Sequence, residues 1–376
     1  MIDMQMNVLF DHQAFYHQKF GGISRYFYEL ARGINLRDDF SASVVAPLHG
    51  NEYLQSGKFK FIKGLCPKRQ LLGTGRVRDL GRKLLLPIYY ALNCNSDIVH
   101  ETYYTMTPSG RGQYRILTVF DMIHELFPAQ FRDDLITVKA KKTAVLRADH
   151  VICISESTRQ DLVRLLGVDQ SKTSVVHLGH SFINSSFNSQ ILIRRTGRPY
   201  LLYVGNRDRY KNFHALCRAF AASNFLRKKF DIVAFGGADF SVIEKEYLVD
   251  FGIIDYVRHV IGGDELLEMH YREASLFVFP SLYEGFGIPP LEAMNCNCPV
   301  VCSNAGSIPE VVGDAGVYFD PYSVDSIRDA IERVVTSTIL QSELLVKGRE
   351  RIKMFSWDKC VKDTAAIYKS VVDGNL

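Results

Sequence analysis

The strongest constraint on the fold is an alternation of short apolar strands and amphipathic helices that runs along the chain twice. β-branched runs bounded by turn residues predict strands, and segments such as GISRYFYELARGI and SVDSIRDAIERVV predict the helices between them. The predicted strands are MNVLF, SASVVAP, DIVHE, RILTVFD, HVICIS and TSVVHL in the first half, and YLLYVGN, FDIVAFGG, VRHVIG, LFVFPS, PVVCSN and GVYFD in the second. This order predicts an α/β protein with two doubly wound parallel sheets.

The alternation fails between residues 177 and 199, in HLGHSFINSSFNSQILIRRTGRP. We therefore expect one domain over residues 1–188 and a second over residues 189–354, a division that suits a chain of 376 residues. Parallel sheets of this type bind ligands at the carboxyl ends of their strands. A central cleft between two such domains is the expected binding site.

Composition excludes several classes of protein. No apolar run is long enough to span a membrane, and MIDMQMNVLFDHQ lacks the pattern of a signal peptide, so we expect a cytoplasmic chain. The eight cysteines lack the paired C-x-x-C spacing and the accompanying histidines of zinc sites. We interpret them as reduced, mostly buried thiols.

A basic segment lies in the first half of the chain. Between Lys58 and Lys83, nine Lys or Arg residues and one acid are interleaved with apolar residues, ahead of LLLPIYYAL. Such a composition suits anionic lipid headgroups, so residues 58–92 are a candidate for contact with a membrane surface. A solvated loop followed by a buried helix fits the same composition. Nucleic acid is not expected, because no nucleic-acid recognition pattern accompanies the charges.

A glycine pair follows the first strand. In FGGISRYFYEL, Gly21 and Gly22 stand just ahead of a predicted helix, where backbone N–H groups are able to approach an anion. The pair is not a dinucleotide fingerprint, because G-x-G-x-x-G is absent. A plain tight turn is the alternative interpretation.

Two basic residues follow the first strand of the second half. YLLYVGNRDRYKN places Arg207 and Lys211 directly after the strand, and such a pair suits a diphosphate whose negative charge grows as it leaves. An ordinary solvated loop fits the same two residues.

The stretch SLYEGFGIPPLEAM follows the predicted strand LFVFPS. Residues 284–287 predict a turn, the two prolines suit the first turn of a helix, and Glu292 lies on that helix. The glycines expose N–H groups near the positive end of the helix, while Glu284 and Glu292 are able to accept hydrogen bonds from hydroxyls on either side of the phosphates. The whole string predicts a sugar-nucleotide site, although two glutamates at this spacing are by themselves a weak signal.

FGGISRYFYEL, VGNRDRYKN and SLYEGFGIPPLEAMNCNCPVVCSNAGSIPEVVGDAGVYFDP together resemble the GT4 family of retaining, metal-independent glycosyltransferases. The likeness is greatest to the bacterial mannosyltransferases that build lipopolysaccharide O-antigen or capsule. It implies the GT-B fold, with two Rossmann-like domains and a final helix over residues 355–376 that crosses back to the first domain. It also implies transfer of mannose from GDP-mannose to a glycan acceptor, lipid-linked in a peripheral membrane setting, without any cofactor. The sequence agrees on the metal, because it contains no Asp-x-Asp pair.

The resemblance also implies roles for single residues. Glu284 would contact the donor sugar, Glu292 the ribose, and Arg207 with Lys211 the diphosphate. The remaining donor contacts would come from the glycine pair, the turn and the end of a strand, namely Gly21, Gly22, Gly285, Phe286, Gly287, Ile288, Val260 and Ile261.

One segment departs from the family pattern. Many relatives carry histidine directly before an aspartate after a first-domain strand, whereas ILTVFDMIHELFP has Phe120 before Asp121 and its histidine at His124. We expect Asp121 and His124 to line the cleft near the donor sugar or acceptor. The alternative is that Asp121 caps a local turn and His124 is simply packed.

Several other functions remain open from the sequence. A UDP-sugar donor would use the same loops. A sugar-nucleotide epimerase, a phosphorylase or a nucleotide-binding protein without chemistry are the rival classes.

Overall fold

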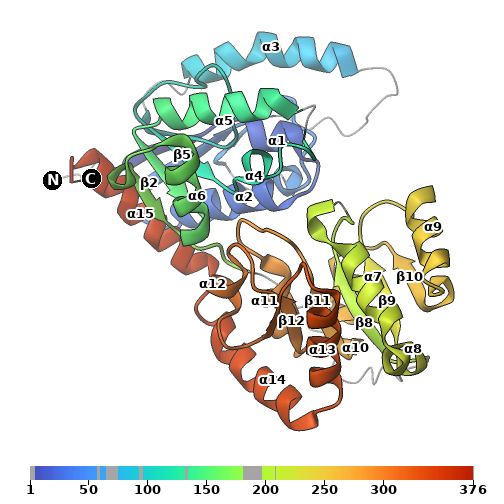
Figure 1. The fold of residues 1–376 in the computed structure, drawn as a ribbon. Coiled ribbons are helices and arrows are strands. Elements are labelled where there is room, and N and C mark those ends of the chain that lie inside the picture. The colour runs from blue at the N-terminus through green and yellow to red at the C-terminus, as the bar shows by residue number, and fades with distance from the viewer. Residues whose placement is uncertain are drawn as a thin grey trace. The chain divides into compact units, whose positions relative to one another are not determined.

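The computed structural model describes residues 5–56, 60–64, 75–92, 96–131, 134–180, 197–207 and 209–375. They form two compact units (Figure 1). Unit 1 contains Met1–Gly179 and Trp357–Leu376, and unit 2 contains His180–Ser356. The expected domain boundary after residue 188 lies outside the described residues.

Unit 1 is built on a seven-stranded parallel sheet in the order β3-β2-β1-β4-β5-β6-β7. The six predicted strands of this half are all present, and the two-residue strand β3 is additional. The strands are β1 Met6–Phe10, β2 Phe40–Val45, β3 Ile62–Lys63, β4 Ser96–Glu101, β5 Gly112–Val119, β6 His150–Cys153 and β7 Thr173–Val175. The helices are α1 Gln13–His17, α2 Gly22–Ile34, α3 Gly75–Leu92, α4 Ile123–Leu126, α5 Leu135–Arg147, α6 Glu156–Leu166 and α15 Trp357–Val372, with 3-10 turns η1 Tyr53–Ser56 and η3 Gln170–Lys172.

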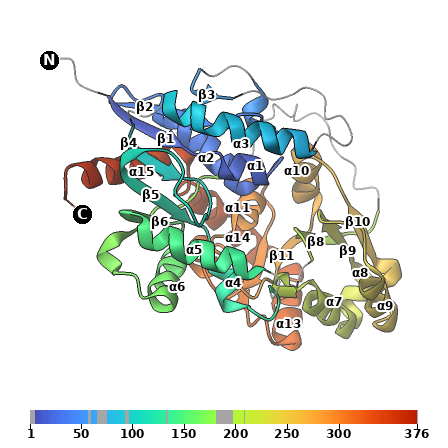
Figure 2. The same ribbon diagram turned by 90° about the horizontal axis from the view of Figure 1, so that it is seen from above.

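Helices from distant parts of the chain cover the two faces of this sheet. Each strand contacts both layers, because successive strand residues point to opposite faces. On one face Phe10 and His100 meet Phe27 of α2 and Tyr368 of α15. On the other face, Leu9 belongs to a small apolar cluster with Val45 and Val99 against which α3 packs. Figure 1 shows α3 above and α15 below the strands of unit 1, and in Figure 2, which is seen from above, α3 lies in front of the strands.

Unit 2 is built on a six-stranded parallel sheet in the order β10-β9-β8-β11-β12-β13, and all six predicted strands are present. The strands are β8 Tyr200–Val204, β9 Asp231–Phe235, β10 Val257–Val260, β11 Leu276–Phe279, β12 Val300–Ser303 and β13 Val317–Phe319. The helices are α7 Phe213–Ala222, α8 Asn224–Lys229, α9 Val242–Asp250, α10 Asp264–Glu273, α11 Ile288–Asn295, α12 Ile308–Val312, α13 Val324–Val335 and α14 Thr338–Ile352, with η4 Arg209–Lys211 and η5 Ile254–Tyr256.

The strand orders place one switch point in each sheet. In unit 2 the chain leaves β8 toward β9 on one side, and β11 pairs with the other side of β8. The loops after β8 and β11 therefore diverge at the carboxyl edge of the sheet, which is where ligands bind in this architecture. In unit 1 the corresponding point lies between β1 and β4.

Two predictions from composition are testable in the described part of the chain. The six described cysteines, Cys153, Cys217, Cys296, Cys298, Cys302 and Cys360, are free thiols and buried, as expected for these six. Over the same residues, no helix combines the length and apolar character needed to cross a bilayer.

Candidate active site

The turn between β11 and α11 has the strand, turn and helix order that the sequence predicts. Gly287 precedes α11 with φ +107°, a backbone conformation that glycine adopts without a Cβ penalty. Pro289 and Pro290 occupy the first turn of α11. Proline has no N–H, so the backbone donors near this helix start come from the turn itself and from Ile288.

Two serine hydroxyls contact backbone carbonyl groups of this turn. The hydroxyl of Ser307 lies 2.8 and 2.7 Å from the carbonyl oxygens of Glu284 and Phe286, and that of Ser303 donates to Ser281 at 2.6 Å. The Phe286 side chain is 3% exposed. Its ring is thus inside unit 2, and the backbone contact with a ligand that is expected of Phe286 stays a prediction.

Lys211 and Glu284 meet at the switch point of unit 2. The Lys211 ammonium lies 2.7 and 3.0 Å from the two carboxylate oxygens of Glu284. Asn212, in a left-handed conformation with φ 58°, donates through its side-chain amide to the carbonyls of Pro280 at 3.1 Å and Pro321 at 2.8 Å. Asn212 therefore ties the loop after β8 to the end of β11, a role that sequence reasoning missed and that asparagine, with its tolerance of positive φ, could have signalled.

Arg207 contacts the loop between β9 and α9. Its Nε lies 2.6 Å from Glu244, its Nη1 donates to the carbonyl of Gly236 at 3.0 Å, and its Nη2 donates to Ala238. The guanidinium also lies 4.7 Å from the centre of the Phe240 ring, and the side chain is only 5% exposed. The structure thus brings Lys211 to Glu284, whereas Arg207 is engaged with a carboxylate and two carbonyls elsewhere at the sheet edge.

The electrostatics of the Arg207 contact favour an ionised partner. Burial opposes the charge of Glu244, yet hydrogen bonds from Ser241 and Arg207 bring the pKa of that carboxyl below its usual value. Ser241 and Glu244 also form the capping box of α9. Arg207 is therefore joined to the start of α9 by a charge-assisted contact.

Glu292 lies on α11 and faces α10. Tyr271, which is fully buried, donates its hydroxyl to Glu292 at 3.3 Å. Burial, with the nearby Glu292 carboxylate as a further cause, raises the pKa of Tyr271 well above its usual value. Tyr271 therefore remains a neutral donor that orients this carboxylate.

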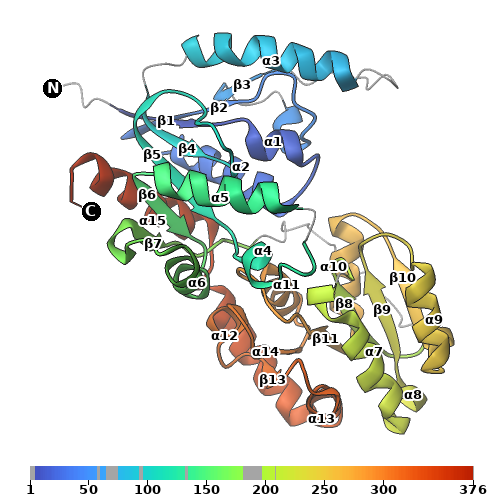
Figure 3. The ribbon, with the colours of Figure 1, turned by 45° about the horizontal axis from the view of Figure 1, so that its top comes forward.

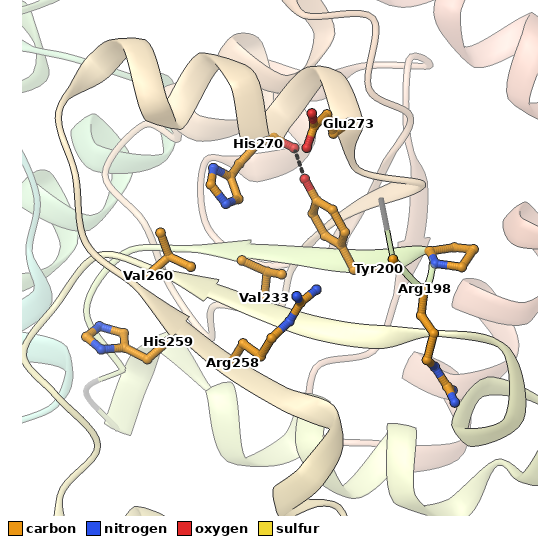
Figure 4. Close-up of a pocket in the computed structure, with 10 residues that line it drawn as sticks. Arg198, Tyr200, Val233, Arg258, His259, Val260, His270 and Glu273 are labelled. Atoms are coloured by element: carbon orange, nitrogen blue, oxygen red, sulfur yellow. Dashed lines mark hydrogen bonds between the residues drawn. The ribbon is translucent and has the colours of Figure 1, made fainter. Parts of the chain in front are cut away.

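Val260 and Ile261, the residues expected near the base, lie at the end of β10. Ile261 is 62% exposed, and Val260 lines a cavity of about 480 Å³ between α10 and the strands β8 to β10. Figure 4 shows this cavity, in which the Tyr200 hydroxyl donates to the His270 carbonyl at 2.9 Å. Its other lining residues precede β8, lie along β9 and β10, or lie on α10 (Gly197, Arg198, Pro199, Val233, Arg258, His259 and Glu273), and the lining includes neither Lys211 nor Glu284.

The glycine pair of unit 1 opens helix α2. Gly21 is the residue before the helix and has an extended backbone, and a Cβ there would meet the Gln18 side chain at 2.5 Å. Gln18 accepts the Ser24 N–H at 3.0 Å, so one N–H of the first turn has a partner within unit 1. A Cβ at Gly22 would meet nothing within 4 Å, which leaves this position open to close approach.

Asp121 and His124 have the geometry of the packed alternative. Asp121 accepts the backbone N–H of Ile123 at 3.1 Å, as a turn cap does. His124 Nε2 lies 2.9 Å from Asp134, and its ring lies 4.6 Å from that of Phe131. Their role near a donor or acceptor stays a prediction.

Asp11 marks the switch point of unit 1, and sequence reasoning missed it. It is fully buried at the end of β1 and accepts the backbone N–H of Thr102, which follows β4, at 2.9 Å. Burial raises the pKa of Asp11, against several hydrogen bonds that lower it. The available signal was its position, since MNVLFD is a strand that ends on an acid.

Comparison with known proteins gives this geometry its context. Residues 20–181 match the family model for Glycosyltransferase Family 4, and residues 184–351 match that for Glycosyl transferases group 1. Each half of this chain thus matches a glycosyltransferase family model. The match confirms the family resemblance, and the two parallel sheets are those of the GT-B fold. The expected cleft between them stays a prediction.

Two curated relatives come from polysaccharide synthesis. O-antigen chain mannosyltransferase B of Escherichia coli is 32% identical over 230 residues, 58% of this chain and 60% of that protein. O-antigen chain mannosyltransferase RfbU of Salmonella typhimurium is 29% identical over 245 residues, 64% of this chain and 65% of that protein. The chain thus spans less than two thirds of the length of either relative.

A solved structure shares the fold of the whole chain. Anabaena Alr3699/HepE in complex with UDP-glucose has a TM-score of 0.71 at 17% identity, covering 97% of this chain and 100% of that chain. At this identity the likeness supports the fold of this chain, and not its substrate.

Proposed function

We propose that this chain is a retaining, metal-independent mannosyltransferase that moves mannose from GDP-mannose to a lipid-linked glycan in bacterial surface polysaccharide synthesis. The observation that carries the proposal is the Lys211–Glu284 contact at the switch point of unit 2, at 2.7 Å. The two mannosyltransferase relatives support the sugar and the process. The chain would act on the cytoplasmic side, peripherally at the membrane that holds its acceptor.

In this proposal Lys211 and Glu284 bind different parts of the donor. A carboxylate has several acceptor sites and an ammonium has three donors, so the pair is able to stay together while each partner binds a different part of the ligand. Glu284 would accept a hydroxyl of the sugar, and Lys211 would donate to the diphosphate as its negative charge grows. Glu292 would accept the ribose hydroxyls from α11.

Backbone donors of the turn complete the proposed phosphate site. The N–H groups of residues 285–288 would face the diphosphate near the positive end of α11. Val260 and Ile261 would approach the base from β10, while Gly21 and Gly22 would act from unit 1, and Asp121 and His124 would lie near the sugar or acceptor. Arg207 would join the diphosphate only by leaving Glu244.

A UDP-sugar is the alternative donor, because a GT-B chain of the same fold has been solved with UDP-glucose. A thermal-shift screen against GDP, UDP, ADP and their sugars discriminates these donors, since a ligand bound by the native state raises the melting temperature. We expect GDP-mannose to give the greatest shift and to be hydrolysed or transferred by the purified protein. A larger response to UDP-glucose would overturn the donor, and binding without turnover would overturn the enzyme assignment.

Retention and metal independence need separate tests. NMR of the product formed from GDP-mannose should show the anomeric configuration of the donor. Turnover should survive excess EDTA, because Lys211 and backbone donors take the role that a metal would fill. An inverted product or activity abolished by EDTA would each remove that part of the proposal.

A further inference from the structure

An apolar stripe is exposed along the outer side of α3. Leu80, Leu84, Ile88 and Leu92 recur every four residues, and their exposed fractions are 60%, 64%, 54% and 78%. Figures 1 and 3 show α3 along an edge of unit 1. The spacing places the four side chains on one face over about 18 Å of helix. The alternative of a solvated loop followed by a buried helix is wrong for this face, because its apolar side chains are exposed.

The opposite face of α3 is fixed to unit 1. Arg82 donates through Nε to the Leu48 carbonyl at 3.0 Å, and its guanidinium lies 4.0 Å from the centre of the Tyr16 ring. Tyr90 shares a hydrogen bond of 2.7 Å with Nδ1 of His12. The helix is thus attached to unit 1 through its polar and aromatic side, and the apolar stripe faces outward.

From this geometry we infer that the outer stripe of α3 docks unit 1 onto an anionic lipid bilayer, with Leu80, Leu84, Ile88 and Leu92 entering the headgroup boundary. The inference rests on the proposed function, in which the acceptor is lipid-linked. It deepens that function by assigning the membrane contact to one face of one helix. Of the wider basic segment 58–92, the structure describes residues 60–64 and 75–92.

Charge argues for lipid rather than a second copy as the occupant. Apart from Arg82, which is bound to unit 1, the sequence of α3 has three basic residues, Arg76, Arg78 and Lys83, and one acid, Asp79, while residues 84–92 carry no charge. A helix with cations toward one end and an apolar face suits anionic headgroups above an acyl layer. Two copies meeting through this helix would instead bring two surfaces of the same positive sign together.

Co-sedimentation with vesicles tests the inference. The full chain should bind phosphatidylcholine vesicles that contain phosphatidylglycerol, and bind more weakly to phosphatidylcholine alone or at high salt. The Leu84→Glu/Ile88→Glu variant should lose at least about tenfold in partitioning to the anionic vesicles. The control variant Ile339→Glu/Val346→Glu changes two residues of α14 that are 74% and 60% exposed, and should bind as the wild type does.

Each outcome decides the inference. Wild-type protein that does not bind anionic vesicles overturns it, and so does an α3 variant that binds as the wild type does. Light scattering after size exclusion tests for a second copy as the occupant. If the wild type is a dimer that does not bind vesicles and the α3 variant is a monomer, the apolar stripe is a contact between two copies.

Donor turnover without vesicles keeps the inference separate from the proposed function. The α3 variant should melt at the wild-type temperature and hydrolyse soluble GDP-mannose at the wild-type rate, because the stripe lies outside the proposed donor site. If no variant turns over the donor, the proposed function fails, whereas the vesicle result still decides the docking surface.

Discussion

Lys211 and Glu284 are 73 positions apart in the sequence, and their charged groups lie 2.7 Å apart. Sequence reasoning assigned both to one ligand without a reason for them to touch. The contact exists because the loop after β8 and the turn after β11 leave neighbouring strands at the same sheet edge. At the scale of single residues, we expect substitutions of this pair to have the largest effect on the proposed activity.

Replacing Lys211 with Met, or Glu284 with Gln, should lower glycosyl transfer by about 100-fold or more, because each variant removes a charge proposed to bind the donor. The free energy of unfolding should fall by only about 1–2 kcal/mol, as for one charge-assisted hydrogen bond. Chromatography of the product measures transfer, and thermal unfolding measures stability. Lys228→Met, at an exposed lysine of α8, is the matched control. Variants that unfold outright would count against the assignment.

Arg207 should behave differently from Lys211. Its guanidinium is nearly buried against Glu244, so Arg207→Met should lower the free energy of unfolding by about 3 kcal/mol by leaving a carboxylate without its partner. Glu244→Gln should share part of that loss, so the double variant should cost less than the two single changes added together. Denaturant unfolding measures all three variants. Unchanged stability with lost turnover would instead favour a direct role of Arg207 on the diphosphate.

At the scale of elements, the turn before α11 depends on one glycine. Gly287 has φ +107°, so alanine there is strained even though a Cβ would meet its nearest neighbour, Phe279, only at 3.7 Å. Gly287→Ala should cost about 1–2 kcal/mol and reduce transfer by shifting the turn that presents Glu284. Gly263→Ala, at φ −82° in open space, is the control. Equal behaviour of the two variants, in thermal unfolding and in product formation, would show that the strain is unimportant.

Element existence was the most predictable part of the fold. Every strand run named from the sequence became a strand, because β-branched runs between turn residues encode strands locally. Strand β3 was not predicted, because its two residues are too few to show the alternation of apolar and polar residues typical of a strand. For the segment that contains α3, the sequence left a membrane-contacting surface and a solvated loop with a buried helix as alternatives, since composition does not show which face of a helix packs.

At the scale of the whole molecule, the last helix, α15, packs on the first unit of the chain. A Cβ on Gly33 of α2 would meet the Val361 side chain of α15 at 2.4 Å, so the two helices touch through a glycine. Farther along α15, the Tyr368 hydroxyl and His100 Nδ1 are 2.6 Å apart. Residues 357–376 therefore belong with the first 179 residues, although unit 2 separates them in sequence.

This contact predicts a rescue. Gly33→Ala should lower the free energy of unfolding by about 1–3 kcal/mol through overpacking against Val361. Adding Val361→Ala should recover part of that loss, because it removes the methyl groups that the new Cβ meets. Thermal unfolding of the single and double variants measures the coupling. Strict additivity of the two changes would mean that α2 and α15 do not press on each other in solution.

The sequence by itself determined the strand and helix order, the glycine and proline turn before α11, and the residues from which a sugar-nucleotide site is proposed. These features depend on neighbours a few residues away, so local propensity and periodicity carry them. Only the tertiary structure decided that Lys211 meets Glu284, that Arg207 turns to Glu244, and that α3 leaves four apolar side chains outward. Such pairings follow from strand order and helix docking, which join residues that no local pattern relates.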